Sequence, residues 1–251
     1  MSLTGLLLVG CAGAAAGAVN AVAGGGSLIS FPALLLTGLS PLAANVTNTV
    51  GLVPGYLGAT LGYRDELAGQ ARRLLVLGAA AGTGAIVGCA LLLAGSPAVF
   101  NRAVPFLVLG ACALLAVQPR VAAWLRRRDG GQVRERQRLL TGAVLLAGVY
   151  ASYFGAGLGV ALLALLGVLV RDGLQRLNAL KAALSLAASS VGAVVFAVIG
   201  PVHLAAAAVL AAGSLVGGRY GAGVARRLPE RLLRVAVLVI GVVVGVALLL
   251  R

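Results

Sequence analysis

Long apolar segments alternate with short polar ones along almost the whole chain. The apolar stretches recur with lengths of about 17 to 25 residues, which is the length that crosses the roughly 30 Å hydrocarbon core of a bilayer. We therefore expect an all-α polytopic membrane protein. The predicted helices span residues 3–23, 27–37, 43–62, 74–94, 103–118, 179–199, 203–218 and 232–250, and two further apolar pieces lie between 139 and 170.

Three consecutive glycines interrupt the first apolar region. Gly24, Gly25 and Gly26 follow a helix-length segment and precede Ser27. Each glycine costs a helix roughly 1 kcal/mol relative to alanine, so the backbone should break here. Backbone groups freed inside a membrane need protein partners or a polar cavity, which makes the break a candidate binding site. The alternative is that these glycines only allow tight packing of a hairpin.

The same order of features begins again in the second half. A second glycine break, Gly155-Ala-Gly157-Leu-Gly159, follows the apolar run that starts at residue 139. Gly148 precedes this break at the same distance as Gly17 precedes the first one. We therefore predict two related transmembrane repeats. The predicted divisions are a first repeat at 1–118, a basic cytoplasmic linker at 119–138 and a second repeat at 139–251.

Composition and charge support the membrane assignment and give an orientation. Of the 251 residues, 61% are hydrophobic and only 10% are charged, whereas soluble domains are roughly 45–50% apolar. The formal net charge of +14 comes from basic residues that lie almost wholly in short connections, which argues against a nucleic-acid-binding face. The positive-inside rule then assigns the basic connections to the cytoplasm and both termini to the opposite side.

This orientation makes each repeat a glycine-broken hairpin followed by three transmembrane helices. The second repeat must then be inverted relative to the first, with about eight to ten membrane segments in all, in the way that many secondary transporters are built. The pattern leaves open whether each hairpin is re-entrant or crosses the membrane completely. In such transporters the substrate site lies where the two breaks meet.

The residues around the first break resemble a known family. The segment from Leu28-Ile-Ser-Phe-Pro-Ala-Leu-Leu-Leu-Thr-Gly-Leu-Ser-Pro41 through Ala44-Asn-Val-Thr-Asn48 is similar to the TauE/SafE family of sulfite and organosulfonate exporters. The resemblance covers nearly the whole chain and implies a multi-pass protein of the bacterial inner membrane. In that membrane, the orientation given by the positive-inside rule makes both termini periplasmic. The family usually has a Thr-Ser pair after the small residues of the second helix, where this chain has Thr47-Asn48 and Lys181-Ala182.

The candidate site residues are those that could bind a small anion. Two helices that begin after the breaks would point their N–H ends at one central volume, and each such end carries about half a positive charge. Lys181 is the only lysine and lies in an apolar segment. Because placing a charged side chain inside a membrane costs roughly 3 kcal/mol or more, its presence there favours a functional role. The alternative is that the lysine stem extends to the cytoplasmic surface. Hydroxyl and amide groups could bind an oxyanion or join helices. The predicted substrate-binding residues are Asn20, Gly24, Gly25, Gly26, Ser27, Asn45, Thr47, Asn48, Gly155, Gly157, Gly159, Lys181 and Ser185.

We therefore predict a secondary transporter that moves a small anion, a sulfur oxyanion or organosulfonate, by alternating access. We expect no enzymatic activity, cofactor or metal, because the chain has a single histidine, no cysteine pair and no nucleotide-binding loop. The alternative is a membrane assembly partner or redox subunit without transport activity. The expected partners are the anion and the lipid bilayer, with no nucleic acid and with a homo-oligomer left open.

Overall fold

The computed structural model describes residues 1–22, 24–127, 137–170, 172–225 and 230–250. Within these ranges the chain forms α-helices and one short 3₁₀ turn, without a strand, so the prediction of an all-α fold is confirmed there. The elements are α1 (Leu3–Val22), α2 (Ser27–Leu36), α3 (Pro41–Gly62), η1 (Asp65–Leu67), α4 (Ala71–Ala94), α5 (Pro97–Arg127), α6 (Gln137–Tyr153), α7 (Leu158–Leu169), α8 (Leu174–Ile199), α9 (Leu204–Ala225) and α10 (Glu230–Leu249).

Several helices are longer than the polar pattern predicts, α5, α8 and α9 by the most. α5 starts at Pro97 and continues to Arg127, past the predicted end at 118, and α8 starts at Leu174 rather than at 179. Arginine, glutamine and leucine are good helix formers, so charged residues at the end of a membrane helix can extend it beyond the apolar stretch. Proline is also well placed in a first helical turn, because its missing N–H would have no helical partner there. The predicted linker therefore overlaps the ends of α5 and α6, and its residues 128–136 lie outside the described part.

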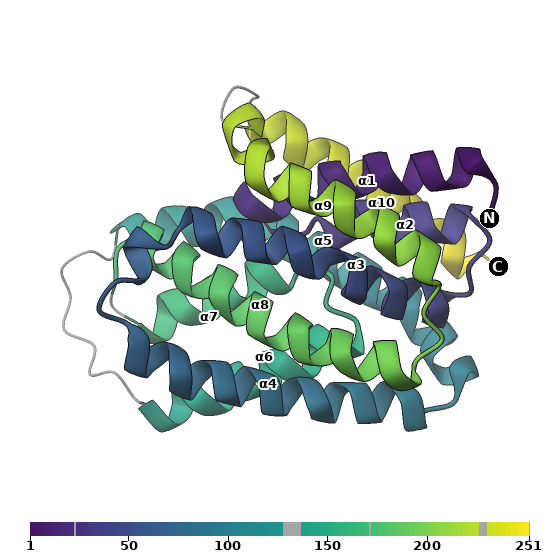
Figure 1. Ribbon diagram of the computed structural model, residues 1–251. Helices are drawn as coiled ribbons and strands as arrows, with labels where there is room; N and C mark the ends of the chain where they lie inside the picture. The colour runs from purple at the N-terminus through teal and green to yellow at the C-terminus, as the bar shows by residue number, and fades with distance from the viewer. Residues whose placement is uncertain (23, 128–136, 171, 226–229, 251) are drawn as a thin grey trace.

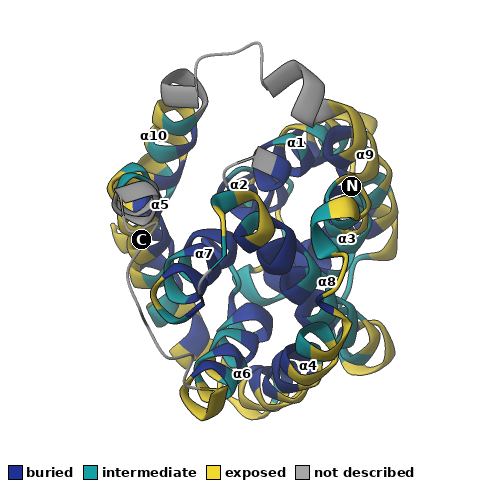
Figure 2. Cartoon of the chain, turned by 90° about the vertical axis from the view of Figure 1, so that its left-hand side faces the viewer, coloured by how far each residue is buried: buried dark blue, intermediate teal, exposed yellow. Residues whose placement is uncertain are grey.

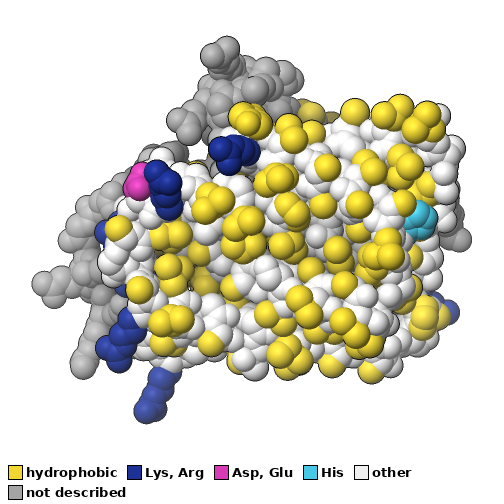
Figure 3. All heavy atoms as spheres, viewed as in Figure 1, with side chains coloured by type: hydrophobic (Ala, Val, Ile, Leu, Met, Phe, Trp, Pro, Cys, Tyr) yellow, Lys and Arg dark blue, Asp and Glu magenta, His cyan; other side chains and the backbone are white. Residues whose placement is uncertain are grey.

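Several of the described helices have the length and composition of membrane spans. Four stretches are long and apolar enough to cross a bilayer, namely Leu3–Ala21, Ala71–Ala94, Pro97–Arg120 and Leu174–Ile199. Shorter apolar stretches lie at Ser27–Leu36, Leu158–Leu169, Leu204–Tyr220 and Arg234–Leu249. Hydrophobic side chains cover much of the face seen in Figure 3, whereas most of its basic side chains gather at one end. These features are those of a multi-pass membrane protein.

The helices pack around a buried centre. α1 lies against α9, and α4 lies against α6, while α3 and α8 contact each other between these two pairs (Figure 1). α5 packs on α10. The view along the helices shows buried residues facing the middle, where the short helices α2 and α7 lie (Figure 2). This arrangement places the two short helices, and the breaks that precede them, in the interior.

Glycines allow the closest helix contacts. A Cβ atom at Gly17 of α1 would collide with the backbone oxygen of Ser214 on α9, and one at Gly148 of α6 would collide with that of Ala81 on α4. Small residues at such contacts let helix backbones approach closely, as is common in membranes. The matching glycines that the sequence places before each break therefore make matching contacts.

The helices run between two opposite ends of the bundle. The N- and C-termini lie at one end of the bundle, and the turn that contains η1 lies at the other, together with the first residues of α6 (Figure 1). α1 therefore starts from the terminal end, and α6 starts from the opposite end. Arg102 lies in the second turn of α5, whereas Arg64, Arg72 and Arg73 lie around η1.

Candidate functional site

Both breaks end the preceding helix in the same way. The N–H of Gly24 donates to the carbonyl of Val19 at 2.9 Å, and the N–H of Gly155 donates to the carbonyl of Tyr150 at 2.9 Å. Gly24 and Gly155 have positive φ values of 76° and 72°. Glycine adopts this conformation without the steric cost that a Cβ atom brings, and it commonly ends helices in this way. The two predicted backbone breaks are therefore present, and each has a glycine where the backbone needs one.

Hydrogen bonds from neighbouring side chains hold the broken backbone. The Oδ1 atom of Asn20 accepts from the N–H of Gly26 at 2.8 Å, and the hydroxyl of Tyr150 donates to the carbonyl of Ala156. Asn45 reaches across from α3 and donates its Nδ2–H to the carbonyl of Tyr153 at 3.0 Å. Such bonds satisfy backbone groups that would otherwise be buried without partners.

The two breaks touch each other. A Cβ atom built on Gly24 would lie only 3.1 Å from the Cα atom of Gly159, although the two residues come from different halves of the chain. A Cβ atom built on Gly159 would lie 3.7 Å from Cδ of Lys181. The stem of the only lysine therefore runs beside the contact between the breaks.

Lys181 is buried rather than extended to the surface. Its exposed fraction is 3%, and its Nζ donates to Oδ1 of Asn178 at 3.1 Å. Because α8 begins at Leu174, the lysine lies about 10 Å along the helix from its start. In this structure the lysine side chain therefore does not extend to the cytoplasmic surface.

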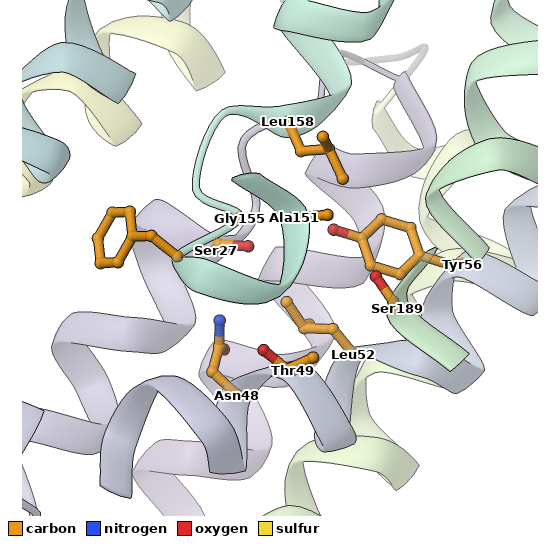
Figure 4. Close-up of a pocket in the computed structure, with 10 residues that line it drawn as sticks. Ser27, Asn48, Thr49, Leu52, Tyr56, Ala151, Gly155, Leu158 and Ser189 are labelled. Carbon is orange, nitrogen blue, oxygen red and sulfur yellow. The ribbon is translucent and has the colours of Figure 1, made fainter. Parts of the chain in front are cut away.

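A small polar cavity lies beside the breaks and is formed by both halves of the chain (Figure 4). The hydroxyl groups of Ser27, Tyr56 and Ser189 face its volume. The side-chain oxygen of Asn48 is buried there without a hydrogen-bond partner. The space open to the centre of a water molecule is about 10 Å³, which is about the volume that one water needs. The lining residues are Ser27, Asn48, Thr49, Leu52, Tyr56, Ala151, Phe154, Gly155, Leu158 and Ser189.

The predicted site residues fall into groups with different surroundings. Thr47 points elsewhere, because its hydroxyl accepts from the N–H of His203 at 3.0 Å, and Ser185 is buried in α8 with an exposed fraction of 2%. Gly26 and Gly157 shape the breaks, since a Cβ on Gly26 would collide with the carbonyl of Ala16 and one on Gly157 would lie 3.2 Å from Cβ of Ala111. Of the other predicted residues, Ser27, Asn48 and Gly155 line the cavity, whereas Gly24, Gly159 and Lys181 meet at the contact between the breaks. Asn20 and Asn45 accept from or donate to backbone groups of the breaks. Gly25 has a positive φ of 93°.

Seven of the lining residues were not among the predicted set, and three of these seven, Thr49, Tyr56 and Ser189, are polar. Ser189 follows Lys181 and Ser185 at a spacing of four, so helical periodicity places all three on one face of α8. Tyr56 lies in α3, and no local pattern distinguishes it from a tyrosine at a membrane surface. Across the described ranges, no three His, Cys, Asp or Glu side chains are grouped so that they could hold a metal ion.

Comparisons with known proteins identify the family. No solved structure matches the chain. A protein of Haemophilus influenzae named "Probable membrane transporter protein" is 26% identical over 236 residues, which cover 93% of this chain and 90% of that protein. The Escherichia coli K12 protein named "Probable membrane transporter protein YfcA" is 25% identical over 239 residues, with 93% and 86% covered. The family model described as "Sulfite exporter TauE/SafE" matches residues 9–248, and the chain therefore belongs to the TauE/SafE family.

Proposed function

We propose that this membrane transporter is a secondary carrier of a small anion, a sulfur oxyanion or an organosulfonate, and that it works by alternating access around the two breaks. The observation that carries the proposal is the contact between Gly24 and Gly159 beside the buried Lys181. The substrate class draws support from the family description, sulfite exporter.

The packing supports two inverted repeats. α1 and α6 start from opposite ends of the bundle (Figure 1), and each is followed by a break and a short helix. The contact of Gly17 with α9 has its counterpart in the contact of Gly148 with α4. Exchanging the two halves therefore preserves these contacts but reverses the direction of the helices, which is the relationship that inverted transporter repeats have.

The polar groups around the breaks suit an anion. Lys181 has a neutral hydrogen-bond partner in Asn178, so an anion beside it would offset the cost of burying a positive charge. Hydroxyl groups donate to oxyanion oxygens, and Ser27, Tyr56 and Ser189 place theirs around one small volume (Figure 4). The N-termini of α2 and α7 begin at the same breaks and add partial positive charge.

The small volume of the cavity corresponds to a closed conformation of such a site. A volume of about 10 Å³ has room for one water and is too small for a sulfur oxyanion. Binding therefore requires α3 and α8 to move relative to the broken hairpins. In the alternating-access scheme this opening happens toward each side of the membrane in turn.

The distribution of arginine gives the proposed orientation. Arg64, Arg72, Arg73 and Arg176 lie near the end of the bundle that is opposite the termini. By the positive-inside rule this end faces the cytoplasm, and both termini are then periplasmic in a bacterial inner membrane.

Uptake into proteoliposomes tests the proposed class of function. Purified protein would be reconstituted, and the uptake of labelled sulfite, thiosulfate, sulfoacetate, sulfate and chloride would be measured with and without an imposed proton or sodium gradient. We expect saturable uptake of at least one sulfur anion above the level of protein-free liposomes. If none of the anions enters under any gradient, the proposal of a sulfur-anion carrier is wrong, and the alternative of an assembly partner gains support.

A further inference from the structure

A second cavity lies at the arginine-rich end of the molecule, where α4, α6 and α8 begin. Its volume is about 600 Å³, far larger than the cavity beside the breaks. Arg72 and Arg73 contribute from α4, Gln137 from α6, Asp172 from the connection before α8, and Arg176 from the first turn of α8. The size and lining fit a charged group rather than a single water.

Ion pairs fix the basic side chains around this cavity. Asp172 accepts from Arg73 at 2.6 Å and from Arg176 at 3.2 Å. Arg73 also donates to Oε1 of Gln70 at 3.1 Å, and Gln70 is only 4% exposed. With Arg72, the lining residues that the structure describes include three guanidinium groups and one carboxylate, so this described lining is net positive and can bind more negative charge.

Exposed apolar side chains lie directly beside the basic residues. On α4, Leu75 is 74% exposed and Val76 is 41% exposed, and on α6 Leu139 is 52% exposed. They follow Arg73 and Gln137 by only a few residues in the direction of the membrane. A ligand bound here could therefore place an anionic group among the arginines and an apolar chain along α4 and α6.

We propose that this cavity binds the phosphate group of an anionic phospholipid. Arginine binds phosphate with two parallel N–H donors, and basic pockets between membrane helices at the cytoplasmic side are suited to anionic headgroups. The exposed leucine and valine side chains favour a lipid over a soluble phosphate ester, because only the lipid would also cover apolar surface.

Native mass spectrometry of the detergent-purified full chain would test this inference, with phosphatidylglycerol and phosphatidylcholine titrated separately. The variant carries Arg72→Gln and Arg176→Gln. The control carries Arg64→Gln and Arg219→Gln, which remove the same charge outside the cavity. We expect the apparent Kd for phosphatidylglycerol to rise about tenfold or more in the cavity variant and to change less than twofold in the control. Phosphatidylcholine should bind weakly to all three proteins.

Two results would overturn the proposal. Equal weakening in the two double variants would mean that the lipid responds only to overall charge. Binding of glycerol phosphate as tight as that of phosphatidylglycerol, with the same loss in the cavity variant, would assign the cavity to a soluble phosphate ester. The single variant Arg72→Gln leaves the Arg73–Asp172–Arg176 ion pairs intact, so a folded protein is available if the double variant does not fold.

Discussion

Replacing Gly24 by alanine probes the contact between the two breaks. Gly24 has a φ of 76° and a Cβ there would lie 3.1 Å from the Cα atom and 3.2 Å from the carbonyl carbon of Gly159. Gly69 provides a matched control, because it has a φ of 77° and no atom within 4 Å of an added Cβ. The two substitutions therefore share the backbone penalty and differ in the contact.

The magnitudes follow from these two geometries. A left-handed conformation costs a residue with a Cβ roughly 1–2 kcal/mol, and this is the whole expected effect of Gly69→Ala. Gly24→Ala adds the cost of forcing backbone atoms apart in a packed interior, about 1–3 kcal/mol for an overpacked site. We therefore expect a loss of about 2–5 kcal/mol for Gly24→Ala.

Thermal unfolding in mild detergent measures the difference. For a chain of this size 1 kcal/mol corresponds to roughly 2–4 °C in Tm, so Gly24→Ala should melt several degrees below Gly69→Ala. The same preparations should show proteoliposome transport reduced in Gly24→Ala and close to wild type in Gly69→Ala. If the two variants have equal Tm values, the two breaks do not pack as described and the reasoning fails.

Three further predictions use other contacts. Asn20→Ala removes the acceptor for the buried N–H of Gly26, so it should lower the free energy of unfolding by about 1–3 kcal/mol; a Tm equal to that of wild type would contradict this. Asp172→Asn weakens a partly buried pair with Arg73 and should lower Tm by more than Asp65→Asn, whose carboxylate is 90% exposed; the two melting curves, measured side by side, decide between them. A periplasm-specific reporter fused to the C-terminus should be active, and activity of a cytoplasm-specific reporter at that position would refute the proposed orientation.

Local sequence signals predicted the helices and the breaks because their causes are local. Consecutive glycines at 24–26 interrupt a helix whatever packs around them, and the break at Gly155 has the same backbone conformation as that at Gly24. The helix ends were less predictable. α8 starts at Leu174, before the predicted start at 179, because good helix formers in the preceding polar stretch extend the helix.

The surroundings of single polar side chains could not be read from local patterns. The hydroxyl of Thr47, one of the predicted substrate-binding residues, accepts from the N–H of His203, which is distant in sequence. The depth of Lys181 depended on where α8 begins, and its burial beside Gly159 depended on how the two breaks pack. These features follow from long-range packing, for which a single sequence gives no distance.

The most direct measurement of the central claim is the initial rate of sulfur-anion uptake by proteoliposomes containing Lys181→Gln. Glutamine keeps a hydrogen-bonding side chain of similar length but removes the charge. Arg64→Gln is the control, because it removes one positive charge from a side chain that is 79% exposed. We predict that Lys181→Gln lowers uptake at least tenfold while Arg64→Gln stays within twofold of wild type. Wild-type uptake by Lys181→Gln, with the protein folded, would contradict an anion site at the contact between the breaks.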